Sequence, residues 1–121
     1  MPDFHDSLKK VPLFVKTYEL YKSFYIYVQL FPRKDRYTLG QKCETLLLEI
    51  LEAVIVASSL SKQDKLPILK RASAKIDVLR VLFTLGRDLK IIEIKKHQIF
   101  ENSLQEIGRM FGGWIKSTGQ T

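Results

Sequence analysis

Apolar residues recur every three or four positions along four segments of the chain, which is the period of an amphipathic α-helix. The spacing predicts helices over residues 12–31, 38–58, 64–87 and 96–116. Because the connections are short, consecutive helices should be antiparallel, and we expect an all-α, up-down-up-down four-helix bundle. We also expect a single domain over residues 1–121, with loose termini at 1–10 and 117–121.

Local signals mark the ends of these helices. Pro12 suits a first helical turn, and Pro32 ends the first helix because the residue before a proline is pushed out of the α region. Thr38 and Asp64 are the predicted N-caps of the second and third helices.

The third predicted helix has apolar residues on two opposite sides. At about 100° per residue, one stripe consists of Leu69, Ala72, Ile76, Leu79 and Phe83. The other stripe, nearly behind it, consists of Ala74, Val78, Val81, Leu82 and Leu85. A small bundle needs only one stripe for its core. The second must be buried in the middle of the fold or against another copy, so we predict an oligomer interface at Val78, Val81, Leu82 and Leu85.

Charge adds a second feature to this picture. The formal net charge is +7, and residues 9–36 and 62–87 each carry seven basic and two acidic side chains. Such clustering favours a phosphate-bearing or acidic partner, with a merely solvated surface as the alternative. The candidate binding residues are Arg33, Lys34, Arg36, Lys70, Arg71, Lys75, Arg80 and Arg87. Internal salt bridges to Asp77, Asp88 or the glutamates of the second helix are the other interpretation of these cations.

Tyrosines alternate with lysines on the first predicted helix, a pattern found on surfaces that bind single strands. Tyr18, Tyr21 and Tyr25 share a helical face with other apolar residues, which favours core packing for them. Tyr27 and Tyr37 are therefore the better candidates for exposed contacts.

The sequence shows no pattern typical of catalysis or metal binding. His5 and His97 have no carboxylate or cysteine partner at ligand spacing. Glu49 and Glu52 lie three apart without facing histidines, which favours a solvated or salt-bridged face. Cys43 lies in an apolar series and is expected to be a small core residue, with a reactive thiol as the alternative. We therefore expect no enzyme activity, no metal and no cofactor.

The start of the chain gives an expectation about its compartment. The first fifteen residues carry several charges and no long apolar run, so no secretory signal is predicted. No stretch approaches the roughly 18 uninterrupted apolar residues of a membrane span. Together with the single cysteine, this favours a cytoplasmic protein that does not enter a membrane.

Three segments in order carry a resemblance to a known family. They are FPRKDRYTLGQK at residues 31–42, LKRAS at residues 69–73 followed by Leu79-Arg80, and EIGRMFGGW at residues 106–114. With these segments the chain resembles the Avd-like four-helix bundle proteins, the accessory variability determinants of diversity-generating retroelements. The likeness spans about residues 12–116.

The resemblance implies a homopentameric barrel of basic four-helix protomers that binds the retroelement's reverse transcriptase and its nucleic acid, RNA or DNA. In such systems the polymerase copies a template repeat with adenine-directed errors, and the cDNA diversifies a target gene. The resemblance implies no catalytic centre in the accessory protein. Related four-helix proteins are encoded in intervening sequences of ribosomal RNA genes, so a structural or interaction module without a reverse transcriptase is the alternative function.

Overall fold

The computed structural model describes residues 4–119, and its regular structure in that range is entirely helical. The long helices are α2 (Pro12–Val28), α4 (Gln41–Ala57), α5 (Lys62–Asp88) and α6 (Ile94–Gly119). Three short elements accompany them, namely α1 (Phe4–Leu8), α3 (Arg33–Asp35) and the π-helical turn η1 (Arg36–Gly40). The prediction of an all-α helical bundle is confirmed for the described residues, and each predicted helix matches one long helix.

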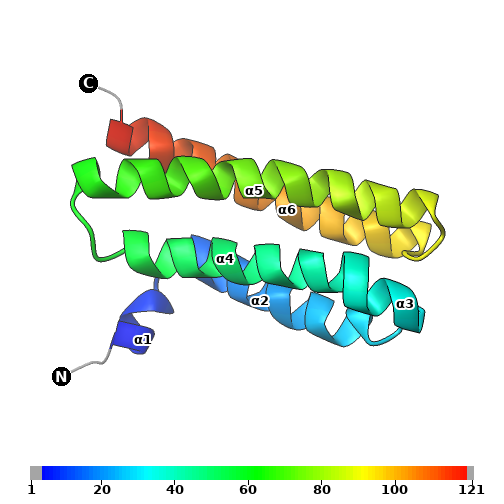
Figure 1. Ribbon diagram of the computed structural model, residues 1–121. Coiled ribbons are helices and arrows are strands. Elements are labelled where there is room, and N and C mark those ends of the chain that lie inside the picture. Colours follow the sequence, from blue (N-terminus) through cyan, green and yellow to red (C-terminus); the bar gives the residue numbers. More distant parts are fainter. Residues whose placement is uncertain (1–3, 120–121) are drawn as a thin grey trace.

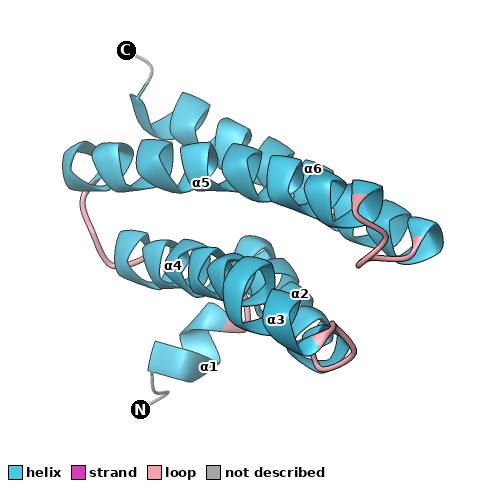
Figure 2. Cartoon of the chain, turned by 45° about the vertical axis from the view of Figure 1, so that its right-hand side comes forward, coloured by secondary structure: helices cyan, strands magenta, loops and turns pink. Residues whose placement is uncertain are grey.

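The long helices form two layers, with α5 and α6 in one and α2 and α4 in the other (Figure 1, Figure 2). Helix α5 packs against its layer partner α6 and against α4 of the other layer. Helix α2 packs against its own layer partner α4 and against α6 of the other layer. Helices α2 and α5 are therefore diagonal neighbours. The colours of Figure 1 show the chain running back and forth along the bundle. Among the helices of residues 4–119, none combines the length and the apolarity that crossing a bilayer requires.

Three phenylalanines lie at the centre of the core. Phe24, Phe83 and Phe100 come from α2, α5 and α6 and are almost inaccessible to solvent. Phe83 stacks on Phe24 with ring centroids 5.1 Å apart and lies 5.3 Å from Phe100. Helix α5 reaches this core through the first predicted stripe, whose members are all buried. The apolar period of α5 therefore identifies its core side correctly.

Two helix starts differ from the prediction. Helix α5 begins after Ser61, whose Oγ accepts a hydrogen bond from the backbone amide of Asp64 at 3.2 Å. Asp64 therefore lies in the first turn and is not the cap. Thr38 lies inside η1, where its hydroxyl donates to the carbonyl oxygen of Lys34 at 2.8 Å. It is not an N-cap either, because helical structure already starts directly after Pro32.

Glycines let the chain approach itself closely at both turns of one bundle end. A Cβ on Gly40 would lie 2.7 Å from Val28 Cγ2 and 3.3 Å from the carbonyl oxygen of Asp35. At the turn between α5 and α6, a Cβ on Gly86 would lie 2.7 Å from Ile92 Cδ1. A larger side chain at position 40 would push η1 away from Val28, so Gly40 lets the basic segment of α3 and η1 lie close against the end of α2.

Parts of the predicted loose termini are helical. Helix α1 is anchored by Leu8, which is buried in the core. Helix α6 continues to Gly119, where a Cβ would lie 2.8 Å from the side chain of Leu66. The burial of Leu8 explains why helical structure begins before the first predicted helix. Residues 1–3 and 120–121, also predicted to be loose, lie outside the described residues.

Cys43 is a core residue, as its apolar series predicts. Burial, and to a lesser extent the nearby charge of Glu44, raises the pKa of its thiol from the ordinary value of 9.0 to about 12. Because the thiolate is the reactive form, the alternative of a reactive thiol is not supported.

We expect the Cys43 thiol of the native protein to resist iodoacetamide at about pH 8 and to react once the chain is unfolded. The folded pKa lies above the unfolded one, so the stability linked to this thiol is complete below pH 9.0 and is lost as the pH rises toward 12. Mass spectrometry of samples treated with and without guanidinium measures the difference. Rapid labelling of the native protein would contradict the burial of this residue.

Candidate functional site

The second apolar side of α5 lies on the surface of the protomer. Val78, Val81 and Leu85 are 46%, 67% and 43% exposed, and Ala74 between them and the helix start is exposed as well. We call these four residues the α5 stripe. Leu82, the fourth predicted interface residue, is half-buried against the core and lies at the edge of the stripe. The sequence left open whether this side faces the core or a neighbour, and within residues 4–119 no other element covers it.

A surface depression of about 350 Å³ adjoins the α5 stripe at Val81. Its polar wall is an ion pair between Arg80 of α5 and Glu101 of α6, with Nε 3.2 Å from Oε1 and Nη2 2.8 Å from Oε2. The hydrogen bonds to Glu101 raise the pKa of the Arg80 guanidinium above its ordinary value. Arg80 therefore joins α5 to α6, and in the protomer its charge is partly satisfied by a carboxylate of the same chain.

Two more of the predicted binding residues are also paired internally. Lys75 Nζ lies 3.4 Å from Oε1 of Glu49 on α4, and Arg87 Nη2 lies 3.1 Å from Oδ1 of Asp88. These are contacts that the salt-bridge interpretation of the sequence predicts. Both pairs are partly exposed, so each stabilises the fold only weakly.

The other predicted cations make no ion pair with any residue of 4–119, namely Arg33, Lys34, Arg36, Lys70 and Arg71. Lys70 lines a depression of about 220 Å³ together with Lys116 of α6. Lys116 lies outside both basic segments of the sequence and was not predicted, although the antiparallel arrangement of α5 and α6 brings it to this end. Arg71 lies instead between α4 and α5 near Glu49 and Glu52, whose charges partly offset its own.

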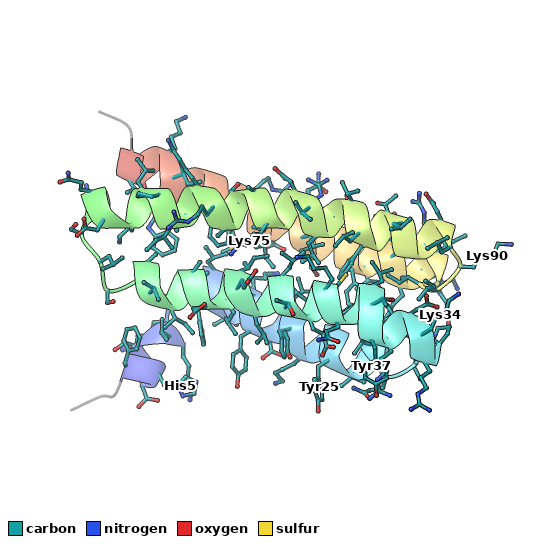
Figure 3. All side chains as sticks on the ribbon, in the orientation of Figure 1. His5, Tyr25, Lys34, Tyr37, Lys75 and Lys90 are labelled. Atoms are coloured by element: carbon teal, nitrogen blue, oxygen red, sulfur yellow. The ribbon has the colours of Figure 1, made fainter. Side chains whose placement is uncertain are left out.

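The basic segment of α3 and η1 lies at the opposite end of the bundle. Figure 3 shows Lys34 and Lys90 at this end, one from the connection after α2 and one from the turn between α5 and α6. Lys90 has a positive φ of 61° and an exposed side chain. It is a second cation that the sequence pattern missed, because it stands outside both basic segments. The bundle thus carries, at both ends, cations that make no ion pair within residues 4–119.

Several tyrosines are placed differently from the prediction. Tyr18 and Tyr25 are exposed, whereas Tyr27 is buried and its hydroxyl oxygen accepts a hydrogen bond from the backbone amide of Glu93 at 3.0 Å. The predictions for these three tyrosines are therefore wrong, and the predicted exposure of Tyr37 is confirmed. The core side of α2 is rotated by about 90° from the centre that Tyr18, Tyr21 and Tyr25 indicate. Aromatic residues occur on nearly all sides of α2, so their spacing alone could not predict which side faces the core.

The histidines and acidic residues form no cluster of the kind that binds metal. Among the described residues, no group of three or more His, Cys, Asp or Glu side chains is placed to hold an ion. His97 is buried, with Nε2 3.3 Å from the Thr84 hydroxyl, and it packs between α5 and α6. The features that remain for function are therefore the α5 stripe, the two basic ends and the exposed tyrosines.

Comparison with known proteins bears on these features. A family model described as bAvd-like matches residues 13–118, from the first turn of α2 to the last turn of α6. No curated protein matches the chain. The match includes every long helix, the α5 stripe and both basic ends. The chain therefore belongs to the bAvd-like family.

Proposed function

We propose that this protein is a non-catalytic accessory component of a diversity-generating retroelement, acting in the cytoplasm as an oligomer that binds the reverse transcriptase and nucleic acid. Membership of the bAvd-like family supports the accessory role. The observation that carries the proposal is the exposed α5 stripe on a protomer whose core is already complete without it. Such a surface is typical of an assembling protein.

The α5 stripe supports self-association. A helix that buries one side and presents aliphatic residues on the other commonly has a partner on the second side. We infer a homo-oligomer, and the resemblance makes a pentamer the expected form. In a closed ring of this kind the contact is head-to-tail, so the α5 stripe meets a different face of the neighbouring protomer. A ring also repeats the basic ends of the bundle several times on one assembly.

The unpaired cations support binding to nucleic acid. Phosphate contacts release counterions, so we expect affinity to fall steeply as salt rises and to depend little on base sequence. Lys70 and Lys116 are favoured for these contacts because no carboxylate of residues 4–119 pairs with them. Arg33, Lys34 and Arg36 provide a second cationic surface, which suits phosphate or an acidic face of the reverse transcriptase.

Lys70→Ala combined with Lys116→Ala is expected to weaken the binding of RNA or DNA and to reduce the slope of log affinity against log salt by about two for each protomer that contacts the strand. The reason is that each lysine removed is one phosphate contact fewer. Fluorescence anisotropy of a labelled oligonucleotide over a salt series measures both quantities. Circular dichroism and light scattering should show an unchanged fold and oligomer size.

The matched comparison is Arg80→Ala combined with Arg87→Ala, which removes the same charge from residues already paired with Glu101 and Asp88. We expect a smaller loss of affinity from this pair. A larger loss would place the phosphate contact at Arg80 and Arg87. If the parent protein binds neither RNA nor DNA at about 50 mM salt, the nucleic-acid part of the proposed function is wrong.

The gene neighbourhood tests the retroelement role independently of binding. We expect a reverse-transcriptase gene and a template repeat beside the gene for this chain. Their absence would favour the structural module of the ribosomal intervening-sequence type.

A further inference from the structure

Four tyrosines gather along the edge of the bundle where α2 meets the start of α4. We call Tyr18, Tyr21, Tyr25 and Tyr37 the tyrosine row. Tyr21 and Tyr25 have ring centroids 6.3 Å apart, and Tyr21 is the half-buried member. Burial, followed by the charge of Glu44 on α4, raises the pKa of Tyr21, which fits its place between the two helices. The row is thus anchored in the bundle while its other members face solvent.

The two most exposed members of the row, Tyr25 and Tyr37, present their rings to the same side. Tyr25 and Tyr37 are 54% and 59% exposed. Figure 3 shows both pointing away from the layer of α5 and α6, one from α2 and one from η1. Tyr18 lies two helical turns from Tyr25, at a rise of about 10 Å. Stacked nucleotides of one strand rise about 3.4 Å each, so these two rings span about three of them.

Cations stand next to the rings of the row. Lys22 Nζ lies 5.5 Å from the ring centroid of Tyr18, and Arg36 Cζ lies 5.6 Å from that of Tyr37. Lys22 also lies 3.4 Å from Glu19, in an exposed pair that contributes little and that a phosphate can replace. Beyond Arg36, the unpaired Arg33 and Lys34 extend the positive charge. Such neighbouring rings and cations suit a nucleic-acid strand, whose bases can stack on the rings while its phosphates contact the cations.

This chemistry distinguishes among possible occupants of the row. An aliphatic surface such as the α5 stripe would leave phenol hydroxyls and charged groups without partners. A duplex hides the faces of its bases, whereas a single strand offers each face for stacking. The combination of exposed rings and nearby cations therefore fits an unpaired strand best.

We propose that the tyrosine row is a stacking platform for the bases of a single-stranded nucleic acid, with Lys22 and the cations of α3 and η1 on its phosphates. The inference rests on the proposed nucleic-acid binding and specifies the ligand as an unpaired strand of RNA or DNA. The proposed stacking is a contact with the bases, in addition to the phosphate contacts, which do not depend on the bases.

The experiment compares strands that have equal charge and differ in their bases. Oligo-dT and oligo-U of about twelve nucleotides are measured beside an abasic strand of the same length, by competition against a labelled oligonucleotide. We expect the parent protein to bind oligo-dT or oligo-U at least about fivefold more tightly than the abasic strand. Comparing oligo-dT with oligo-U shows whether DNA or RNA is preferred.

Tyr25→Leu combined with Tyr37→Leu should strongly reduce this preference for strands with bases, because Tyr18 alone then remains of the row's three exposed rings. The slope of log affinity against log salt should stay unchanged, because no charge is removed. Tyr25→Phe combined with Tyr37→Phe keeps both rings and should retain the preference. Both residues are exposed, so circular dichroism should match the parent in each variant.

Three results would overturn the inference. The leucine variant binding oligo-dT and oligo-U like the parent would show that the rings do not stack on bases. An equal affinity of the parent for abasic and complete strands would leave phosphate contacts alone, and the proposed function would survive without this inference. A leucine variant that binds strands normally but changes oligomer size would assign the row to a second copy of the chain.

Discussion

Val81→Glu is expected to convert the proposed assembly into folded protomers of 14.1 kDa. Val81 is 67% exposed within the α5 stripe, so a carboxylate there is solvated in the isolated protomer and costs the fold little. In the assembly the same carboxylate would be buried without a partner, which costs several kcal/mol per contact. A penalty of about 3 kcal/mol corresponds to more than a hundredfold loss in association. Size-exclusion chromatography with light scattering measures the mass, and circular dichroism verifies the helices.

The control for this variant is Val15→Glu, which places the same charge on an exposed valine of α2, away from the α5 stripe. We expect it to leave the assembly intact, and dissociation would instead place the complementary face of the contact at α2. A parent protein that is already a monomer at micromolar concentration would contradict the proposed oligomer. An unfolded Val81→Glu protomer would contradict the exposure of this residue.

Helical periodicity was enough to predict the long helices and the division of α5 into two sides. Both follow from spacing along one helix, since a helix with a defined core side needs no knowledge of its neighbours. Phe83 and Val81 differ by two positions and therefore face nearly opposite ways, as the structure confirms. Whether the second side lies in the core or at the surface depends on how many helices surround α5. The sequence could not decide that point.

The rotation of α2 could not be predicted for a related reason. Tyrosine is apolar along its ring and polar at its hydroxyl, so it is tolerated at the edge of a core as well as inside one. Tyr27 enters the core because its hydroxyl reaches the amide of Glu93 at the start of α6. That partner is 66 residues away in sequence, and no local pattern indicates it. Tyr25, without such a partner, faces solvent.

The charged surface shows the same dependence on long-range placement. The basic segments are evident in the sequence, but which cations are paired depends on the stagger of neighbouring helices. Arg80 forms an ion pair with Glu101 because α5 and α6 run side by side. Lys70, on the same helix, has no such partner within residues 4–119. The same packing places Lys116 beside Lys70 at one basic end and Lys90 near Lys34 at the other. Residue types could thus be predicted from sequence, but their grouping on the surface could not.

The buried side of α5 should respond to mutation in the opposite way from its exposed side. Phe83→Ala is expected to lower the free energy of unfolding by about 3–5 kcal/mol, because it removes the ring packed against Phe24 and Phe100 and leaves a cavity. At this chain length the loss corresponds to a fall in Tm of more than about 10 °C.

Self-association would add its own stability to that of the fold, so the Phe83→Ala measurement is best made in the Val81→Glu protomer. Urea unfolding followed by circular dichroism then compares Val81→Glu with and without Phe83→Ala. In the otherwise native chain, Phe83→Ala should leave the mass of the assembly unchanged at temperatures where the protomer stays folded, because the α5 stripe is intact. If Phe83→Ala dissociates the assembly without lowering the free energy of unfolding, the two sides of α5 have been assigned in reverse. A loss of stability with unchanged mass would instead confirm that Phe83 supports the core, and the mass of Val81→Glu decides whether Val81, two residues before it, supports the contact between copies.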